Sequence, residues 1–469
     1  MYSATLRLLL IAHFLTAFQV LYADPAQVEI QVDGSKPQWK ISPYLTGSHF
    51  VYASEPDSLF RDGRVAQWMR QSKVGVIRWP GGTAVQNYHW DHLNGIAFKA
   101  DSWAPGYHLP SAPPADFMSL DKYIAFCRQV GAAPMVGINI KSGKDFNRTQ
   151  DSLDEARRLV TYCRDQGYNV KFWYIGNEGY ASGFGVSEYA AYIDRYGAMI
   201  KSIEPDAVII GDWKFGPFAR HRFEQSVRIA QQSRLLDVME FHEKWGDQWG
   251  MSSGQTMEDW RKESPIYNGD LGKYTRLFHE AMAKAGKPGI KVSFNEWGVD
   301  VAGGTPFDAA LVASDYLIEI FRNDVYQACY WDLNIGPAAS RVLKVSRDNA
   351  TLLGFNPVAG VFEMVANALG ETLYQVSSNN GSVYGFAAAG PDGGNLDIYL
   401  LNKAETPMAV NVRAIQFAIP QARASVQAFI QPGRVINRNA GMILPANFSI
   451  TLDPSSFNRV VIRSGTSRG

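Results

Sequence analysis

Several features that mark common classes of protein are scarce in this chain of 469 residues. Cysteine occurs only at Cys127, Cys163 and Cys329, which is too few for a disulfide framework. We expect buried free thiols, although one bridge between Cys127 and Cys163 is compatible with the sequence. Lys plus Arg and Asp plus Glu number 45 each, so no excess of positive charge favours nucleic acid or an anionic membrane surface.

Long apolar segments are also scarce, and the one near the N-terminus has the pattern of a signal peptide. Arg7 precedes the apolar run Leu8 to Tyr22, and Ala23 is the small residue expected before a cleavage site. Two polar residues interrupt the run, and it is short for a membrane anchor. We therefore expect residues 1–23 to be removed and the remaining chain to be secreted or periplasmic, without a membrane contact.

The motifs of several catalytic classes are missing as well. Gly81-Gly82 and Gly303-Gly304 have neither the lysine nor the third glycine of nucleotide-binding loops. The chain contains no G-x-S-x-G nucleophile elbow. His89, His92 and His108 share one loop, but their spacing matches no strong metal-ligand motif. We expect neither a cofactor nor a metal.

Short apolar runs alternate with amphipathic stretches through residues 45–370. The runs are typical of strands buried on both faces of a parallel sheet: Leu45–Tyr52, Val74–Pro80, Ala133–Ile140, Phe172–Glu178, Ala207–Trp213, Val238–Trp245, Lys291–Trp297 and Tyr326–Leu333. Cap residues, glycines and prolines bound the predicted helices Phe117–Val130, Leu153–Gln166 (capped by Asp151 and Ser152), Glu188–Ile203 (following Ser187), Phe307–Asn323 and Val358–Leu369. Eight alternating units predict an α/β fold, a (β/α)8 TIM barrel; an open doubly wound sheet gives a similar string, but this length favours closure.

After Gly370 the hydrophobic period changes to that of short strands separated by turns. These strands are predicted at Val383–Ala387, Leu396–Leu401, Ala409–Val412, Val426–Ile430, Phe448–Leu452 and Val460–Ile462. They indicate a C-terminal antiparallel β-sandwich domain over residues 371–469. Val28, Ile30 and Val32 alternate with polar residues, so we expect residues 24–44 to add a strand to this sandwich before the catalytic barrel of residues 45–370.

Polar and aromatic residues end the predicted barrel strands, where active groups of such barrels lie. They are Arg78, Asn139, Asn177-Glu178, Trp213, His242, Asn295-Glu296-Trp297 and Trp331. A buried apolar strand that ends in a carboxylate is unusual because desolvating the charge is costly, and Glu178 and Glu296 do so at opposite sides of one mouth. Two facing carboxylates suit cleavage of a glycosidic bond, in which one protonates the leaving oxygen and the other attacks or activates water. A structural ion pair is the alternative for either glutamate alone.

Three segments resemble a known group of enzymes. Tyr174-Ile175-Gly176-Asn177-Glu178-Gly179 resembles the acid/base motif of clan A glycoside hydrolases, and Ser293-Phe294-Asn295-Glu296-Trp297 resembles their nucleophile strand. Arg78-Trp79-Pro80-Gly81-Gly82 is similar to the second-strand motif of the family fifty-one α-L-arabinofuranosidases. The likeness covers roughly residues 28–375 and implies the barrel-plus-sandwich architecture of that family.

The resemblance implies a role for each matching residue. Glu178 would be the acid/base and Glu296 the nucleophile of a reaction that retains configuration. Arg78 would bind the nucleophile and keep it ionised, as a nearby cation does. Asn177 would bind the sugar hydroxyl next to the reacting carbon, and His242 would lie beside the carboxylates.

Four further residues complete the candidate substrate-binding set. Asn139 would hold a sugar hydroxyl or support the mouth of the barrel. Trp213, Trp297 and Trp331 would offer flat faces to sugar rings, with Trp297 and Trp331 the best candidates. Packing beneath the loops is the alternative for such tryptophans, since this residue type is usually well buried.

The chain also departs from the family pattern. Tyr52 stands where the family carries a substrate-binding glutamate, and His242-Glu243-Lys244 stands where aromatic residues usually follow the histidine. These departures concern the substrate. α-L-Arabinofuranosides of plant or algal polysaccharides are our first expectation; the alternatives are another clan A activity (β-xylosidase, β-glucanase, uronidase or agarase) or a carbohydrate-binding barrel without catalysis.

Overall fold

The structure is a computed structural model that describes residues 27–52, 56–91, 101–106, 118–214, 220–246, 254–331, 333–390, 394–417, 419, 422–443 and 447–464. The predicted signal peptide, and with it His92 and His108 of the loop considered as a metal site, lies outside these residues. In the described part of the chain no helix is long and apolar enough to cross a membrane.

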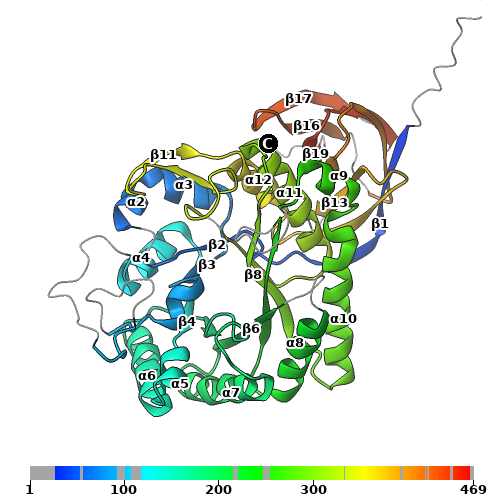
Figure 1. Ribbon diagram of the computed structural model, residues 1–469. Helices are drawn as coiled ribbons and strands as arrows, with labels where there is room; N and C mark the ends of the chain where they lie inside the picture. Colours follow the sequence, from blue (N-terminus) through cyan, green and yellow to red (C-terminus); the bar gives the residue numbers. More distant parts are fainter. Residues whose placement is uncertain are drawn as a thin grey trace, which may run out of the picture.

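Eight parallel strands close into a barrel at the centre of the larger domain (Figure 1). In order around the barrel they are β2 (Gly47–His49), β3 (Val76–Trp79), β4 (Ala133–Ile138), β5 (Phe172–Ile175), β6 (Val208–Lys214), β7 (Val238–Trp245), β8 (Lys291–Val299) and β9 (Gln327–Tyr330). Pairing of β2 with β9 closes the ring, so the prediction of a closed barrel over an open sheet is confirmed.

The predicted strands match the observed ones with small differences at their ends. β5 ends at Ile175, three residues before the predicted end at Glu178. Gly176 has φ 74° and Glu178 has φ 46°, and backbone in this left-handed region cannot continue a β ladder. The chain therefore turns sharply between β5 and Glu178.

One main helix follows each strand and packs outside the barrel. These helices are α3 (Gly63–Gln71), α4 (Leu120–Val130), α6 (Thr149–Asp165), α7 (Val186–Ile203), α8 (Arg220–Gln232), α10 (Asp270–Lys284), α11 (Pro306–Arg322) and α12 (Val358–Val365). Shorter pieces are α2 (Asp57–Arg61), α5 (Lys141–Asp145), α9 (Met257–Lys262), η1 (Gly82–Gln86), η2 (Ile266–Gly269), η3 (Ala366–Ala368) and the hairpin β10 (Leu343–Val345) and β11 (Leu352–Phe355).

Three predicted helix starts are wrong by a short distance, and the first of these helices, α4, begins at Leu120 instead of Phe117. α6 begins at Thr149, so Asp151 and Ser152 lie inside its first turn instead of capping it. α7 begins at Val186, where Glu188 accepts a hydrogen bond from the backbone N–H of Gly185. A carboxylate in the first turn satisfies a free N–H much as a cap residue does, which is why sequence alone misplaced the cap.

The C-terminal domain is a single nine-stranded sheet within the described residues. The strands are β1 (Val28–Lys40), β12 (Thr372–Ser378), β13 (Val383–Ala389), β14 (Asn395–Asn402), β15 (Met408–Ile415), β16 (Arg423–Ile430), β17 (Arg434–Ile443), β18 (Asn447–Leu452) and β19 (Ser456–Arg463). Their order is β17-β16-β19-β14-β13-β12-β1-β15-β18, and among these described strands β1 and β15 pair in parallel while the other neighbours are antiparallel. The sequence missed β12 and β17, which have no regular alternation of apolar and polar residues.

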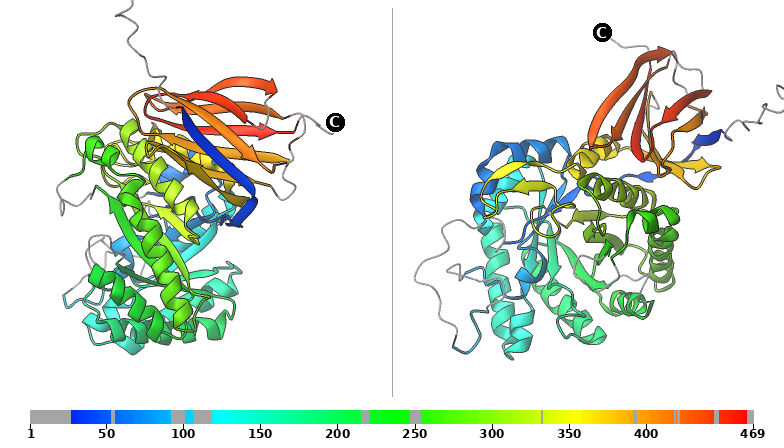
Figure 2. Two further views of the ribbon diagram at one scale, coloured as in Figure 1. Left: turned by 90° about the vertical axis from the view of Figure 1, so that its right-hand side faces the viewer. Right: turned by 45° about the horizontal axis from the view of Figure 1, so that its top comes forward.

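The two faces of the sheet pack against different partners. Residues from one face, including Val28, Ile398 and Val412, form a core of their own, which agrees with a sheet folded over itself as the predicted sandwich. The other face lies on α11 of the barrel (Figures 1 and 2). There Phe386 stacks on Phe321 with ring centroids 4.9 Å apart. Burying such a ring contributes about 1.5–3 kcal/mol, so the sheet is firmly attached to the barrel.

The three cysteines form no disulfide bond. Cys127, Cys163 and Cys329 are all free and buried, which excludes the Cys127–Cys163 bridge that the sequence left open. Burial raises the pKa of the Cys163 thiol to about 12, so it stays protonated and unreactive.

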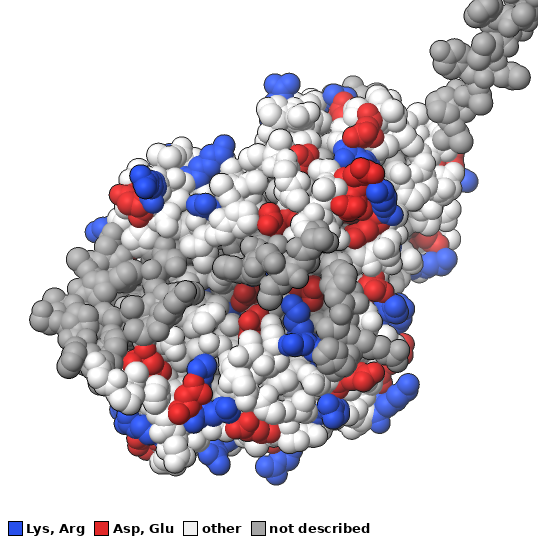
Figure 3. All heavy atoms as spheres, in the orientation of Figure 1, with Lys and Arg blue, Asp and Glu red and all other residues white. Residues whose placement is uncertain are grey.

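Acidic and basic side chains are interspersed over the face shown in Figure 3, as the balanced composition predicts.

Candidate active site

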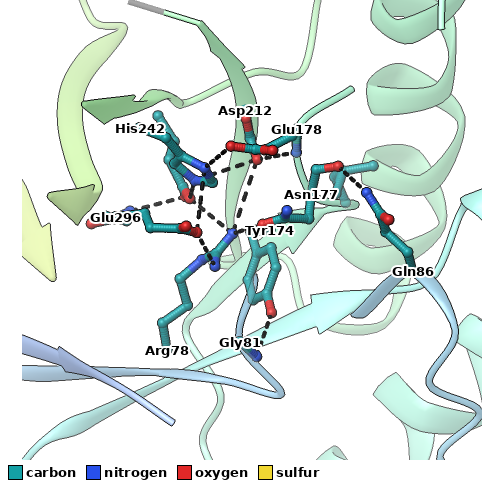
Figure 4. Close-up of polar contacts among 12 residues, drawn as sticks. Arg78, Gly81, Gln86, Tyr174, Asn177, Glu178, Asp212, His242 and Glu296 are labelled. Carbon is teal, nitrogen blue, oxygen red and sulfur yellow. Dashed lines mark hydrogen bonds and ion pairs between the residues drawn. The ribbon is translucent and has the colours of Figure 1, made fainter. Parts of the chain in front are cut away.

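Charged side chains from neighbouring barrel strands meet at one point inside the mouth of the barrel. Figure 4 shows Arg78 from β3, Glu178 after β5, Asp212 from β6, His242 from β7 and Glu296 from β8 pointing toward one another. All but Glu178 are buried, and the side chain of Glu178 is 29% exposed. The cluster therefore has one member that faces open solvent.

His242 lies at the centre of this cluster. Its Nδ1 is 3.2 Å from Oε1 of Glu178 and 3.3 Å from Oε2 of Glu296. Its Nε2 is 2.9 Å from Oε1 of Glu240 and 3.4 Å from Oδ2 of Asp212. Burial alone would lower the pKa of His242, but the surrounding carboxylates outweigh it and raise that pKa well above its ordinary value. The ring is an imidazolium with both nitrogens donating.

Arg78 is fully buried and holds the floor of the cluster. Its guanidinium contacts Glu240 at 3.0 Å and Glu296 at 3.5 Å, and it donates to Oδ1 of Asn177 at 2.9 Å. The guanidinium carbon also lies 4.0 Å from the ring centroid of Tyr174. A buried cation needs this many partners because its desolvation is expensive.

The glycines after Arg78 allow the close packing of this floor. Gly81 has φ 77°, and its N–H donates to the hydroxyl of Tyr174 at 3.2 Å. A Cβ at Gly81 would lie 2.1 Å from the carbonyl oxygen of Phe50, so no other residue fits without a shift of the backbone. The Pro-Gly-Gly motif thus lets the chain turn tightly beneath the cluster.

Glu296 is surrounded by cations. Nζ of Lys244 is 3.1 Å from its Oε1, and the Arg78 guanidinium is 3.5 Å from its Oε2. Burial would raise the pKa of Glu296, but His242 and then Lys244 outweigh it and lower that pKa to about 2. Glu296 is therefore ionised, which a nucleophilic carboxylate requires.

Glu178 is held by its backbone and its side chain. Its N–H donates to Oδ2 of Asp212 at 2.5 Å, and its carboxylate accepts from His242. Burial would raise the pKa of Glu178, but the hydrogen bond and charge of His242 lower it to about 2. In the free site the proton between these two residues sits on His242.

Two candidate ligand sets for a metal lie in the same cluster: Glu178, His242 and Glu296, and Asp212, Glu240 and His242, each with atoms within 4.8 Å of one another. Both nitrogens of His242 already contact carboxylates, and these carboxylates raise the pKa of its ring well above the ordinary value. The Arg78 guanidinium already supplies a cation to Glu240. These contacts suit the sharing of protons among the side chains of the cluster.

Several predicted substrate-binding residues are placed elsewhere. Trp297 is fully buried between Tyr316, Tyr330 and Phe362, so the prediction of a sugar platform there is corrected. Side chains alternate along a strand, and because Glu296 faces the barrel mouth, Trp297 faces the helices.

The other three predicted residues, Trp213, Asn139 and Trp331, differ in their surroundings. Trp213 is 2% exposed and packs on Tyr189 of α7, which leaves little of its ring to a sugar. Asn139 binds Ser142 through its amide group at 2.7 Å and thereby supports the strand mouth. Trp331 lies at the cluster itself, with Nζ of Lys244 4.4 Å from its ring centroid, but it is 4% exposed and packs against Val51 and Ala84, so it too leaves little of its ring to a sugar.

Sequence reasoning missed Asp212 and Glu240 as members of the cluster. Both lie inside apolar strands, and a charge buried in such a strand is the signal that could have found them. It also missed His49, whose Nε2 is 3.0 Å from Arg78. Lys244 stands out in the sequence as a departure from the family pattern, but its contact to Glu296 is visible only in the fold.

Relatives of this chain share the segment that carries much of the cluster. Residues 68–246 match the family model described as the alpha-L-arabinofuranosidase 1 domain. Alpha-L-arabinofuranosidase C of Emericella nidulans is 26% identical over 180 residues, 33% of this chain and 32% of that protein. An intracellular exo-α-(1→5)-L-arabinofuranosidase of Bifidobacterium longum is 22% identical over 259 residues, 50% of this chain and 44% of that protein.

Solved structures extend the similarity to the whole fold. An α-L-arabinofuranosidase from Thermotoga maritima, solved with arabinose, has a TM-score of 0.72 at 21% identity and covers 93% of this chain and 100% of that one. This chain resembles the family 51 α-L-arabinofuranosidases. The resemblance that the sequence motifs indicated is thereby confirmed, and so is the architecture of barrel plus sheet domain. The matched segment is about a third of the length of the Emericella relative.

The structure explains one departure from the family pattern. Tyr52 stands at the position of the family's substrate-binding glutamate. Its side chain is buried and packs against the rings of Trp79 and Tyr88. His49, earlier on the same segment, lies beside Arg78 and Glu296. The first-strand contribution to the site is therefore an imidazole.

Proposed function

We propose that the protein is a retaining glycoside hydrolase in which Glu178 is the general acid/base and Glu296 the nucleophile. The observation that carries this proposal is the approach of the two carboxylates, whose oxygens come within 4.8 Å of each other. Retaining glycosidases hold their two carboxyl groups ~5–5.5 Å apart, whereas inverting enzymes leave ~6.5–9.5 Å for a water molecule. An approach this close between one oxygen of each carboxylate is shorter than the inverting separation and so supports the retaining geometry.

In the first step Glu296 attacks the anomeric carbon and forms a glycosyl ester. The bond to the leaving oxygen breaks, and that oxygen takes a proton from Glu178. Arg78 and Lys244 keep Glu296 ionised before the attack. Asn177, held by Arg78, binds the sugar hydroxyl next to the reacting carbon.

The proton that Glu178 donates comes from His242. A single hydrogen bond of 3.2 Å joins Nδ1 of His242 to Oε1 of Glu178. A bound sugar removes the remaining water from Glu178, which disfavours its charged form and raises its pKa. The proton then moves from Nδ1 to Oε1 as the leaving group departs.

In the second step Glu178 acts as a base. Its carboxylate takes a proton from a water molecule, whose oxygen attacks the anomeric carbon of the ester, and passes that proton back to Nδ1 of His242. The bond to Glu296 breaks, the sugar leaves with its original configuration, and the Glu296 carboxylate is restored. Two inversions at one carbon give net retention.

The substrate that we propose is an α-L-arabinofuranoside of plant or algal polysaccharides. The named relatives and the domain match over residues 68–246 support this choice, because that segment carries Arg78, Glu178 and His242. We propose further that the chain is exported after cleavage behind Ala23. The presence of both carboxylates favours catalysis over carbohydrate binding alone.

A second candidate is another clan A activity on a different glycan, namely that of a β-xylosidase, β-glucanase, uronidase or agarase. Lys244 beside the nucleophile is the observation that favours it, because it departs from the pattern of the arabinofuranosidases. A Paenibacillus polymyxa xyloglucanase also shares the fold, with a TM-score of 0.66 at 14% identity over 93% of this chain and 99% of that one.

The stereochemistry of the product tests the proposed reaction. We expect proton NMR during hydrolysis of an α-L-arabinofuranosyl oligosaccharide to show the α-anomer first, before mutarotation. First appearance of the β-anomer would refute the retaining mechanism. Hydrolysis of a β-xyloside, β-glucan, uronide or agarose instead of the arabinoside would refute the proposed substrate but not the proposed mechanism.

A further inference from the structure

The backbone of Glu178 has an unusual conformation that a second carboxyl group holds in place. Glu178 has φ 46°, in the left-handed region that residues other than glycine rarely adopt. Its N–H donates to Oδ2 of Asp212 in a short hydrogen bond of 2.5 Å. Asp212 itself is completely buried at the end of β6. A strained backbone persists only where its surroundings impose it.

We propose that Asp212 is a positioning residue for Glu178, which fixes the acid/base in reach of both the leaving oxygen and the imidazolium of His242. The proposal rests on the proposed function, because it gives Asp212 a part in the same reaction. Asp212 touches neither the substrate nor the reacting atoms. It acts through the main chain of Glu178 and through His242.

Asp212 can serve as a rigid anchor because its own strand is fixed. Its backbone N–H donates to the hydroxyl of Tyr189 at 2.8 Å, and that hydroxyl donates to the carbonyl oxygen of Ile175 at 2.7 Å. Tyr189 thereby ties the end of β6 to the end of β5, just before the turn that carries Glu178. The position of Glu178 relative to β6 is set from two sides.

The second contact of Asp212 orients the proton donor. Nε2 of His242 lies 3.4 Å from Oδ2 of Asp212, the same oxygen that accepts from Glu178. That contact and the 2.9 Å contact to Glu240 hold the ring with Nδ1 directed at Glu178. One carboxylate oxygen thus aligns the backbone of the acid and the ring that supplies its proton.

Leaving-group dependence distinguishes this role from a merely structural one. A glycoside with a good leaving group, such as 4-nitrophenolate, departs without much help from an acid, whereas a sugar alcohol requires protonation. We expect Asp212→Ala to reduce kcat/KM for an arabino-oligosaccharide by about 10²–10³-fold, within the range that general acid catalysis contributes. The loss on 4-nitrophenyl α-L-arabinofuranoside should be roughly tenfold or less in the glycosylation step.

Two further variants sharpen the comparison. Asp212→Asn keeps an oxygen that can accept from the Glu178 N–H, so the oligosaccharide activity should be partly rescued relative to Asp212→Ala. Glu319→Gln is the matched control, because Glu319 is also a buried carboxyl group with a pKa raised by burial to about 7, but it lies on α11 and contacts Arg322. Glu319→Gln should leave the ratio of the two activities unchanged. An equal loss of both activities in Asp212→Ala would overturn the proposal.

Crystal structures of the wild type and Asp212→Ala give a test that does not depend on the substrate. The expected result is that Glu178 leaves the left-handed region and its carboxylate moves away from Glu296 in the variant. An unchanged Glu178 backbone in Asp212→Ala would overturn the proposed role of Asp212 even if the protein hydrolysed some other glycan. Failure of the wild type on both arabinosides would refute the proposed substrate alone, and the crystal structures would still decide the role of Asp212.

Discussion

Nζ of Lys244 lies 3.1 Å from Oε1 of Glu296 and 4.4 Å from the ring centroid of Trp331. The family pattern places aromatic residues after the histidine of this strand, so this chain has added a cation at its proposed nucleophile. A cation at this distance stabilises the carboxylate form of Glu296.

Replacement of Lys244 should shift the acidic limb of the pH profile. Lys244 helps to lower the pKa of Glu296 to about 2, so Lys244→Met should raise this pKa. The acidic limb of kcat/KM, where Glu296 gains a proton, should therefore move to higher pH. Lys273→Met, which removes an exposed lysine that pairs with Asp270, is the control. Superimposable acidic limbs for wild type and Lys244→Met would contradict this role.

Replacement of Arg78 should lower the stability of the fold. Arg78→Met leaves Glu240 buried without its guanidinium partner at 3.0 Å, and loss of one member of a buried pair costs about 3–5 kcal/mol. Urea unfolding measures this loss. Arg64→Met, which breaks the solvent-exposed pair with Asp62, should cost far less, because water screens such a pair. Similar midpoints for the two variants would show that the buried contacts of Arg78 do not stabilise the fold.

Attachment of the sheet domain can be tested at one aromatic pair. Phe321 of α11 and Phe386 of β13 stack at 4.9 Å, and each is fully buried. Phe386→Ala should lower the free energy of unfolding by about 3–5 kcal/mol. A double-mutant cycle with Phe321→Ala should give a coupling of roughly 0.5–1.5 kcal/mol, as ring pairs do. Additive losses would mean that the two rings stabilise their domains independently.

A buried histidine outside the active site should make stability depend on pH. His89 contacts Glu155 at 2.8 Å and Asp101 at 3.0 Å. Burial alone would lower the pKa of His89, but these hydrogen bonds raise it to about 9. A pKa raised in the folded state stabilises fully below the unfolded pKa of ~6.5 and loses this contribution as pH rises toward about 9.

The variant His89→Gln isolates this contribution. The difference in free energy of unfolding between wild type and His89→Gln should stay constant below pH ~6.5 and shrink between there and pH ~9. Denaturant titrations at several pH values measure it. A difference that is constant up to pH ~9 would show that His89 carries no proton in the fold.

The sequence predicted the barrel well because its strands are apolar runs bounded by glycine, proline and polar residues. Val238–Trp245 matches β7 at both ends. It predicted β17 poorly because Arg434–Ile443 is an edge strand whose polar residues give no alternation. A hydrophobic pattern arises where side chains are buried, so a strand with few buried side chains has only a weak pattern in the sequence.

The candidate site could be predicted as far as strand ends and family motifs reach. Glu178, Glu296 and His242 were found in this way, and the structure brings them together. Trp297 was misjudged because its neighbour Glu296 takes the inward face of β8. Asp212 could not be found from a motif, since its proposed role lies in contacts to Glu178, 34 positions earlier in the chain, and to His242.

Hydrolysis of 4-nitrophenyl α-L-arabinofuranoside by the wild type, Glu178→Ala and Glu296→Ala tests the central claim most directly. The account predicts turnover by the wild type and a loss of several orders of magnitude in Glu296→Ala, with azide restoring activity and giving an arabinosyl azide of inverted configuration. Glu178→Ala should release 4-nitrophenol in a burst and then stall, because the glycosyl ester lacks its base. Full activity in either variant would contradict the assignment of Glu178 and Glu296 as the reacting pair.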